Sequence, residues 1–586
     1  MSTRKVTSDP NANASHAPAQ SSAGEGGFVI RSHRTLALLA LLTIALKSLI
    51  FAPIGVWPLA FVCLVPWLIF VSCSRLAPRV YLYSYLMALV FFLINMRWLY
   101  YATGIGYLAL SIYQAAYFPL LACTIRHAVR RRGWPLAIVF PLLWTGSEIL
   151  RAVVISGFPW FFLSHSLHSV LSLIQISDAV GAYGVSFLIA AVNGAIADLI
   201  FARLRPSGEP TTATLKSSYK NRARRGAVFA SIALIATFTY GQYQLRRDTM
   251  QDGPRVAIVQ GDFLMTVTNE EAPDSEKRTI YYSMLAEAAK QDPDLFVLPE
   301  TPWIMYLNPE MRDFDSVWRE SFAALQRRAS QSNAYLITGS GSLIQTPLDL
   351  LTKQRRHNSA MLFHPDGTEP DRYDKVHVVY FGETVPFRFG RLRFLYFWFN
   401  SLMPFSGADG TDEYSLFPGS DFSRFEIKAP SCNGRTFRLG IPICYEDVMP
   451  YVARRFVGAG GDRKMADLLI NISNDGWFGR GVQQAQHLAI CVFRAVENRV
   501  GIARSVNTGI SALIDPNGLV HDRVWGDEAT PWPRACGFAV GTVKTDSRFT
   551  LYTRYGDWFA WACALFWLVF FIDYWIARAK SHTGDA

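Results

Sequence analysis

Residues 439–447 read Leu-Gly-Ile-Pro-Ile-Cys-Tyr-Glu-Asp, an apolar run that ends in a cysteine, a tyrosine and two acidic residues. The apolar run predicts a short buried strand, and the residues after it predict a turn. Cys444 is therefore expected at a strand-to-turn elbow, which exposes the sulfur and points a backbone N–H toward a neighbouring oxyanion. For this segment alone, a buried structural cysteine is the alternative, because free cysteines pack well in cores.

Two other segments carry side chains that suit acyl-transfer chemistry. Residues 295–302 read Leu-Phe-Val-Leu-Pro-Glu-Thr-Pro, which places Glu300 at the rim of a sheet, where α/β proteins commonly hold reactive groups. Residues 371–377 read Asp-Arg-Tyr-Asp-Lys-Val-His, so Lys375 precedes a second carboxylate, Glu383, by eight positions. Taken alone, each of these segments favours an ordinary solvent-facing carboxylate or lysine.

The region from about 253 to 548 reads as an α/β domain, because short β-rich runs alternate with amphipathic helical stretches. Two segments, 364–367 and 515–518, have the Pro and Gly composition of hairpin turns. The expected strands are 255–260, 295–298, 335–338, 359–363, 437–441, 468–471 and 511–514, and the clearest expected helices are 276–290, 312–332 and 483–499.

The rest of the chain indicates a membrane protein. Hydrophobic residues make up 51% of the 586 and charged residues only 18%, with a mean hydropathy of +0.15, which is too apolar for a wholly soluble protein. About seven apolar stretches fall within a transmembrane domain at 34–246, and one more lies at 555–578. The Phe158-Pro159-Trp160 stretch suits a re-entrant segment. The expected spans are 35–52, 57–73, 81–101, 105–127, 134–155, 178–202, 226–243 and about 556–577.

Basic residues fall in alternate loops between these stretches. If those loops are cytoplasmic, the domain at 253–548 lies outside the cytoplasm and both termini lie inside. The same clustering accounts for the net charge of +11, so no nucleic-acid partner is expected. The clusters are Arg31 and Arg34, Arg75 and Arg79, Arg126 and Arg130 to Arg132, Lys216 to Arg225, and Arg578 and Lys580.

Neither the N-terminal segment nor the cysteines suggest further chemistry. Residues 1–33 form an expected disordered cytoplasmic tail, rich in Ser, Ala, Pro and Gly and without a secretory cleavage signal. The eight cysteines show no metal-ligand spacing, so no metal is expected. Apart from Cys444, the cysteines outside the apolar runs are Cys432, Cys491 and Cys536.

Together, the ordered Glu300, Lys375 and Cys444 resemble the nitrilase superfamily, whose Glu, Lys and Cys follow three separate strands. The seven-plus-one membrane layout and several later motifs resemble its apolipoprotein N-acyltransferase branch in particular. The resemblance runs from about Leu36 to Arg578 and implies an αββα sandwich beside the membrane helices. The later motifs are Asn471 to Gly479, Gln486-His487, Arg494-Ala-Val-Glu497 and Arg504 to Ser511.

The resemblance also implies roles for these residues. Cys444 is the expected nucleophile, Glu300 its base and Lys375 the cation that stabilises the oxyanion with a backbone N–H near Tyr445. Glu383 is expected to hold Lys375, and Glu446 to shape access of the incoming amine. A phospholipid would donate the acyl chain and a diacylglyceryl apolipoprotein would accept it, at the bacterial inner membrane with a periplasmic catalytic domain and without a cofactor.

A run of aromatic and basic residues at 387–399 independently favours a lipid substrate. It reads Phe-Arg-Phe-Gly-Arg-Leu-Arg-Phe-Leu-Tyr-Phe-Trp-Phe, and this interleaving suits an interfacial arm, although a place in the core is the alternative. The residues expected to contact lipid are Phe387, Arg388, Trp398 and Phe399.

Some positions depart from the family's usual pattern, namely Tyr380, Thr384, Gly476 and Val500. The run Gly261 to Met265 replaces a usual Asn-x-Pro and a nearby substrate-loop Trp, so only an apolar role for Phe263 is carried over. Two other classes remain: a membrane-tethered amidase, which would need only one anchor, and a transporter, which would need more ionisable groups in its spans than Lys47 and Glu148.

Overall fold

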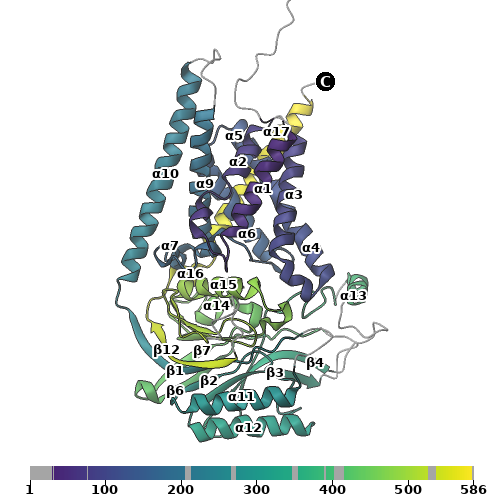
Figure 1. Ribbon diagram of the computed structural model, residues 1–586, viewed down its shortest axis with the longest axis vertical. Helices are drawn as coiled ribbons and strands as arrows, with labels where there is room; N and C mark the ends of the chain where they lie inside the picture. The colour runs from purple at the N-terminus through teal and green to yellow at the C-terminus, as the bar shows by residue number, and fades with distance from the viewer. Residues whose placement is uncertain are drawn as a thin grey trace, which may run out of the picture.

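A bundle of long helices stands on an α/β domain in the computed structural model of the chain (Figure 1). Most of the expected tail at 1–33 lies outside the described residues. The structure describes residues 30, 32–74, 77–204, 213–265, 272–345, 354–388, 391–401, 415–524 and 536–583.

Each of the eight expected spans corresponds to helix in the bundle. Five helical segments of the described chain are long and apolar enough to cross a membrane, four before β1 and one at the C-terminal end. The second expected span is broken into two short helices at residues 57–73, and the fourth is interrupted at Ala116. The helices are α1 His33–Leu49, η1 Trp57–Phe61, α2 Val65–Cys73, α3 Ala77–Asn95, η2 Arg97–Tyr101, α4 Gly104–Ala115, α5 Tyr117–Arg130, α6 Leu136–Val153, α9 Ala182–Leu204, α10 Ala213–Leu245 and α17 Trp558–Thr583.

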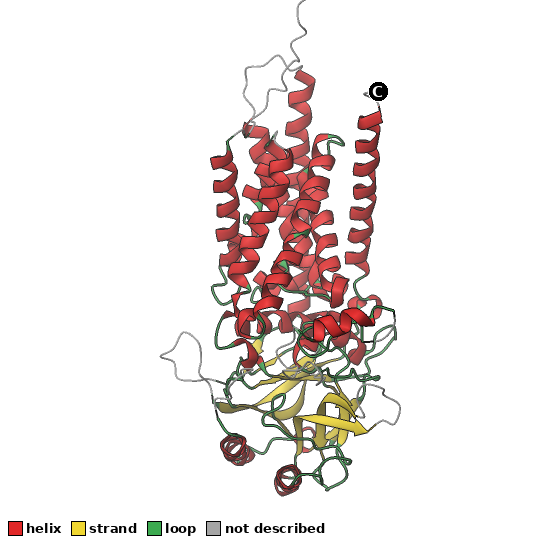
Figure 2. Ribbon diagram, turned by 90° about the vertical axis from the view of Figure 1, so that its right-hand side faces the viewer, coloured by secondary structure: helices red, strands yellow, loops and turns green. Residues whose placement is uncertain are grey.

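Basic side chains tie together the end of the bundle that lies away from the α/β domain. Arg126 donates hydrogen bonds to the carbonyls of Val71 and Ser74, so the ends of α2 and α5 meet there. Arg132 pairs with Asp573 of α17, which brings the C-terminal helix to the same end. Figure 2 shows the C-terminus at this end and the strands at the other.

The α/β domain contains two six-stranded sheets. Their strand orders are β12-β1-β2-β3-β4-β5 and β11-β10-β9-β8-β7-β6. The strands are β1 Met250–Gln260, β2 Leu295–Val297, β3 Tyr335–Gln345, β4 Gln354–Phe363, β5 Asp371–Asp374, β6 Arg424–Ala429, β7 Arg435–Gly440, β8 Leu468–Ser473, β9 Gly501–Val506, β10 Ala512–Ile514, β11 Val520–His521 and β12 Gly537–Asp546.

The two sheets pack face to face, with a helix pair outside each. The Ser505 hydroxyl on β9 donates to the carbonyls of Val259 and Val297 at 2.8 and 3.0 Å, directly joining the sheets. This αββα sandwich is the predicted fold class. Helices α11 Asp274–Ala289 and α12 Ser316–Ser332 cover one sheet, and α14 Pro450–Val457 and α15 Val482–Asn498 cover the other (Figure 1).

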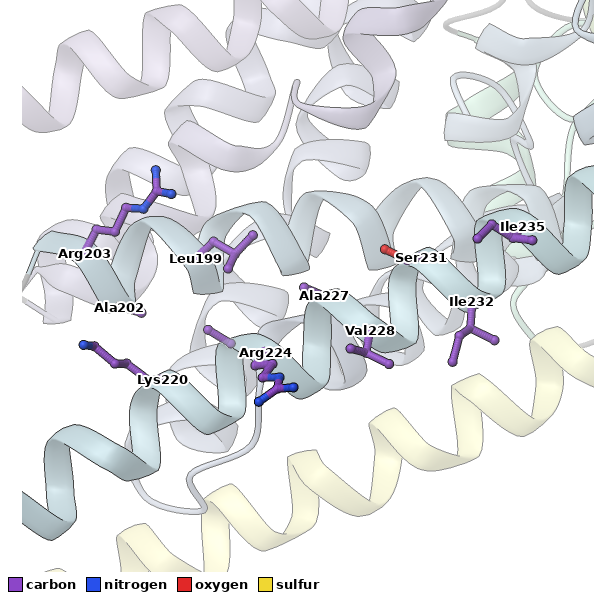
Figure 3. A pocket seen from close by; sticks show the side chains of 11 residues that line it. Leu199, Ala202, Arg203, Lys220, Arg224, Ala227, Val228, Ser231, Ile232 and Ile235 are labelled. Carbon is purple, nitrogen blue, oxygen red and sulfur yellow. The ribbon is translucent and has the colours of Figure 1, made fainter.

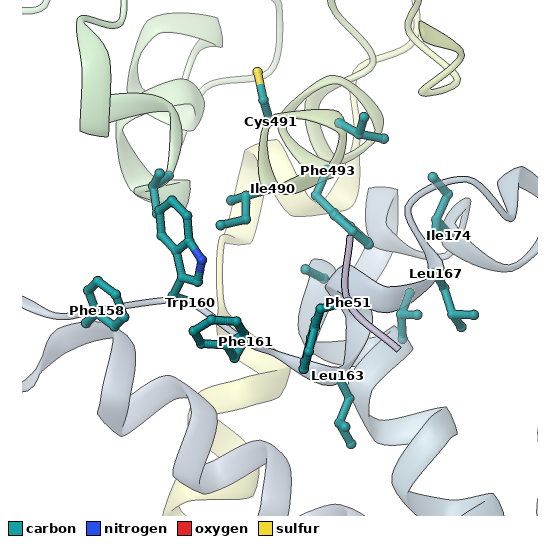
Figure 4. Packing of buried hydrophobic residues seen from close by; sticks show 14 of the residues in the cluster. Phe51, Phe158, Trp160, Phe161, Leu163, Leu167, Ile174, Ile490, Cys491 and Phe493 are labelled. Carbon is teal, nitrogen blue, oxygen red and sulfur yellow. The ribbon is translucent and has the colours of Figure 1, made fainter. Parts of the chain in front are cut away.

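Helix α15 and the end of the bundle share one apolar core. Trp160, Phe161 and Phe51 converge there with Ile490 and Phe493 of α15 (Figure 4). The segment after α6, which was expected to be re-entrant, supplies this contact: Trp160 is 2% exposed and its indole N–H donates to Gln486 Oε1 at 2.9 Å. The bundle and the α/β domain are thus fastened together by buried side chains.

Candidate active site

Cys444 lies at the predicted elbow. It follows β7 and begins the short 3-10 helix η6, Cys444–Asp447, with a φ of +53°. Such a left-handed conformation is unfavourable for a residue with a side chain, so the surrounding structure must hold it. Ile443 forms a bridge with Ile472 of β8, which fixes the chain directly before the turn. The thiol side chain is half-buried.

Glu300 follows β2 and is 6% exposed. One carboxylate oxygen, Oε1, accepts a hydrogen bond of 2.6 Å from the side-chain amide of Asn358 on β4. The backbone of Glu300 passes very close to β3 at Gly339, where an added Cβ would lie 2.7 Å from the Glu300 Cα atom. A glycine is therefore required beside Glu300.

Lys375 follows β5, and its side chain is 1% exposed. The ammonium lies 2.7 Å from Glu383 Oε1 and 4.0 Å from Glu300 Oε1, so a single cation stands between two carboxylates. Asn358 contacts both Lys375 and Glu383. Its backbone carbonyl accepts the Lys375 backbone N–H at 2.8 Å, and its side-chain amide lies 3.4 Å from Glu383. The structure therefore places Lys375 beside Glu300, and the Cys444 side chain interacts with both: it hydrogen-bonds Glu300 and lies within the electrostatic reach of Lys375.

Burial and charge set the protonation of these groups. Burial raises the pKa of Glu300 above its ordinary value, more than the nearby Lys375 lowers it. Burial also raises the pKa of the Cys444 thiol, and Glu300 raises it further. Burial opposes the charge on Lys375, but Glu383, Cys444 and Glu300 outweigh it and raise the pKa of Lys375. The resting site therefore holds a neutral thiol, and a base must take the thiol proton as it attacks.

Glu446 does not face an incoming substrate, which corrects the role expected for it. It is fully buried, and its carboxylate accepts the backbone N–H groups of Val376 and His377 at 2.8 and 2.9 Å and that of Ile443 at 2.8 Å. The hydroxyl of Tyr373 donates to the same carboxylate. Glu446 thus links the loop after Lys375 to the elbow that carries Cys444.

A buried network of charged side chains supports the elbow that carries Cys444. His487 on α15 lies 2.7 Å from Asp447 and 2.9 Å from Asp475, and Arg504 pairs with the same two carboxylates. Burial opposes the charge on His487, but Asp447 and Asp475 raise its pKa to about 9, so the imidazole is protonated and the four groups balance in charge. The network joins η6, the Asn-Asp-Gly-Trp turn, α15 and β9.

The residue after the nucleophile contacts the bundle. The Tyr445 hydroxyl donates to the carbonyl of Gly157, in the segment after α6, at 3.4 Å. The His377 ring stacks on Tyr445, with ring centres 6.0 Å apart, and Trp98 of the bundle meets the Phe478 ring edge-on at 5.1 Å. The elbow therefore lies at the junction of the two parts of the molecule.

Comparison with known proteins identifies the family. Residues 45–195 match the family described as the apolipoprotein N-acyltransferase N-terminal domain, and residues 255–529 match the carbon-nitrogen hydrolase family. An apolipoprotein N-acyltransferase of Geobacter metallireducens is 30% identical over 542 residues, covering 90% of this chain and 92% of its own. The chain belongs to the apolipoprotein N-acyltransferase family. It is an acyltransferase, and the candidate site lies in its carbon-nitrogen hydrolase domain.

A second relative and a solved structure also match the chain. The apolipoprotein N-acyltransferase of Chlorobaculum tepidum is 26% identical, with 85% of this chain and 88% of that one covered. The crystal structure of a CN-hydrolase superfamily protein from Xanthomonas campestris matches 50% of this chain and 91% of its own, with 18% identity and a TM-score of 0.32.

The acyltransferase has its aromatic arm on a short helix, α13 Arg393–Asn400, which lies beside the α/β domain just below α4 in Figure 1. Trp398 is 58% exposed, whereas Phe399 is half-buried between Phe381 and Phe387. Arg388 is not an exposed lipid contact, because it is buried with its guanidinium 4.3 Å from the centre of the Phe417 ring. Residues 389 and 390 of the run lie outside the described residues.

The altered run at 261–265 is held inside the hydrolase domain. The backbone of Phe263 exchanges hydrogen bonds with the side chain of Asn507, and its ring packs 6.0 Å from Tyr281. The expected apolar role of Phe263 is thus a core contact. Sequence reasoning missed three residues that build the site: Asn358, Gly339 and Tyr373. The polar Asn358 inside a strand was the one available signal.

Proposed function

We propose that this acyltransferase moves an acyl chain from a phospholipid, through a thioester on Cys444, to the α-amine of the diacylglyceryl-cysteine that begins an apolipoprotein. The observation that carries this proposal is the position of the elbow. The Tyr445 hydroxyl bonds the segment after α6, and this contact with the bundle supports a nucleophile within reach of the ester groups of bilayer lipids. A soluble amidase has no need for that junction.

In the first half-reaction, the Cys444 sulfur attacks the ester carbonyl carbon while Glu300 takes the thiol proton. The negative oxygen of the tetrahedral intermediate is stabilised by the Lys375 ammonium and the backbone N–H of Tyr445. When the C–O bond breaks, Glu300 returns the proton to the leaving lysophospholipid oxygen, and the acyl group remains on sulfur.

In the second half-reaction, the lipoprotein amine attacks the thioester carbonyl and Glu300 takes a proton from its nitrogen. The C–S bond then breaks, the amide is released, and the proton returns to the Cys444 sulfur. Glu383 keeps Lys375 charged and in place through both steps, since its carboxylate is the nearer of the two that flank the ammonium.

We also infer an orientation in the inner membrane. The basic end of the bundle, defined by Arg126, Arg130 and Arg132, would face the cytoplasm, and the hydrolase domain would face the periplasm. The lipoprotein substrate would meet the site there.

Mass spectrometry of the full chain incubated with phospholipid tests the proposal. We expect an acyl thioester on the peptide that contains Cys444. The Cys444→Ala variant should form none, because it has no nucleophile. The Cys444→Ser variant should also form none, because a carboxylate cannot appreciably ionise an alcohol. Cys432→Ala is the matched control, since Cys432 is also half-buried but lies beside the Gly253 carbonyl. A normal thioester in Cys444→Ala, or one on Cys432, would overturn the assignment.

A further inference from the structure

A groove of about 500 Å³ lies between α9 and α10. Its floor and walls are apolar along most of its length, whereas three cations, Arg203 of α9 and Lys220 and Arg224 of α10, stand at its basic end (Figure 3). The apolar lining is outward-facing: Val228, Ile232 and Ile235 are 51%, 62% and 65% exposed, respectively. An exposed apolar groove on a membrane helix pair faces acyl chains.

The cations at the end of the groove have no anionic partner among the described residues. Within the described part of the chain, neither Arg203, Lys220 nor Arg224 makes an ion pair or hydrogen bond there. Lys220 and Arg224 are four residues apart on α10, so they share one face and repel each other. The nearest carboxylate on α9, Asp198, is held by the backbone N–H of Ala137. An external anion would relieve this repulsion.

The length of the groove fits a lipid in one leaflet. From Lys220 to Ile235 the helix rises about 22 Å, at about 1.5 Å per residue. One leaflet contributes about 15 Å to a hydrocarbon core of about 30 Å. With the lipid headgroup at the three cations, the apolar part of the groove would therefore lie at the depth of the acyl chains. Basic pockets between transmembrane helices are the usual sites for anionic headgroups.

We propose that this groove binds an anionic glycerophospholipid, with its phosphate against Arg203, Lys220 and Arg224 and an acyl chain between α9 and α10. The site is separate from the candidate active site, because the three cations belong to the end of α9 and the beginning of α10, and these lie at the end of the bundle opposite the α/β domain (Figure 1). The lipid is bound and not consumed, and it supports the packing of α10, which stands at the edge of the bundle. The inference depends on the chain spanning a bilayer, whichever leaflet meets the basic end.

Native mass spectrometry of the full chain in neutral detergent tests the site, with phosphatidylglycerol or phosphatidylcholine added. All variants are made in the Cys444→Ala background, so acyl transfer cannot consume the bound lipid. The lipid-binding result therefore does not depend on whether the proposed acyl transfer is correct. We expect retention of phosphatidylglycerol over phosphatidylcholine. Replacing Arg203, Lys220 and Arg224 together by Gln should reduce that retention at least tenfold, since each cation near a membrane anion contributes severalfold.

The matched control replaces three exposed cations outside the groove, Arg34, Arg79 and Arg225, by Gln, which removes the same charge. It should keep the lipid. Ala227→Phe should displace the lipid without changing any charge, because it fills the groove, and it carries the test if the triple variant fails to fold. Equal retention of the two lipids, equal loss in both triple variants, or full retention in Ala227→Phe would each overturn the site.

Discussion

At the scale of single residues, Asn358 connects the groups that set the protonation of the site. Its side-chain amide donates to Glu300 at 2.6 Å and lies 3.4 Å from Glu383, while its carbonyl holds the backbone of Lys375. The hydrogen bond to Glu300 stabilises the ionised carboxylate, which partly offsets the effect of burial. Asn358 is thus a positioning residue that also tunes the base.

The rate of thioester formation should therefore fall at acid pH. This fall is the acid limb of the pH profile, and its midpoint should report the pKa of Glu300. Only the ionised carboxylate accepts the thiol proton, so the rate rises with pH through a pKa above the ordinary 4.5. Asn358→Ala removes a bond that lowers this pKa, so the limb should move to higher pH and the plateau rate should fall about tenfold. Single-turnover thioester formation measured against pH checks both. A limb that stays in place would exclude Glu300 as the titrating base.

Gly339 controls the position of Glu300 through space alone. A Cβ at Gly339 would lie 2.6 Å from the Thr301 nitrogen and 2.7 Å from the Glu300 Cα, and both of these are backbone atoms that cannot rotate away. Gly339→Ala should shift the base and slow thioester formation about a hundredfold, the usual effect of a displacement near 1 Å.

Gly461→Ala is the matched control for this substitution. The nearest atom to a Cβ at Gly461 is 3.4 Å away, which is ordinary contact, so thioester formation should be unchanged. A Gly339→Ala enzyme with normal activity would show that β3 and the Glu300 segment can separate freely.

At the scale of elements, the aromatic-rich helix α13 lies at the level where the bundle meets the α/β domain (Figure 1). Phe394, Phe397 and Trp398 are 66%, 53% and 58% exposed, respectively. Replacing these three by Ser should lower activity on bilayer phospholipid while sparing a short-chain soluble ester, because docking at the interface is lost and the chemistry is kept. Assays on both substrates check this.

Phe314→Ser provides the comparison for α13. Phe314 is 82% exposed directly before α12, the helix that Figure 1 places farthest from the bundle, so its loss should affect neither substrate. Equal loss on both substrates in the α13 variant would mean that these residues support the fold.

Two strand ends were predictable from sequence because apolar runs mark buried strands, and these runs place Glu300 and Cys444 at their tips. Lys375 follows the polar strand β5, so only the order of the three residues along the chain pointed to it. The direction of a side chain in a tight turn is not encoded in that pattern. Cys444, two residues before Glu446, has a φ of +53°, and after this turn the Glu446 carboxylate points inward to three backbone N–H groups. Likewise, the Arg388 guanidinium lies over the ring of Phe417, which is 29 positions away in the sequence. The alternation of aromatic and basic residues at 387–399 cannot reveal such a contact.

At the scale of the whole molecule, the first and last described residues of the bundle lie opposite the hydrolase domain. Ile30 bridges Ser74 at the basic end of the bundle, and Asp573 of α17 pairs there with Arg132. At the other end Tyr445 bonds Gly157, and Glu497 of α15 accepts the Ala182 N–H at 2.9 Å. A bilayer around the bundle would therefore separate the termini from the domain that carries Cys444.

Two matched substitutions test this separation. The background chain has its three accessible cysteines, Cys432, Cys444 and Cys536, replaced by Ser, and its remaining cysteines are buried. In this background, Lys428→Cys places a thiol on β6, and Lys580→Cys places one on α17. Both positions are exposed. A membrane-impermeant maleimide added to intact spheroplasts should label Lys428→Cys, because the seven crossings expected from the sequence before β1, an odd number, would export the α/β domain. Lys580→Cys should be labelled only after permeabilisation, since α17 returns the chain across the bilayer. Labelling of both on intact spheroplasts would require one crossing more or fewer than the bundle contains.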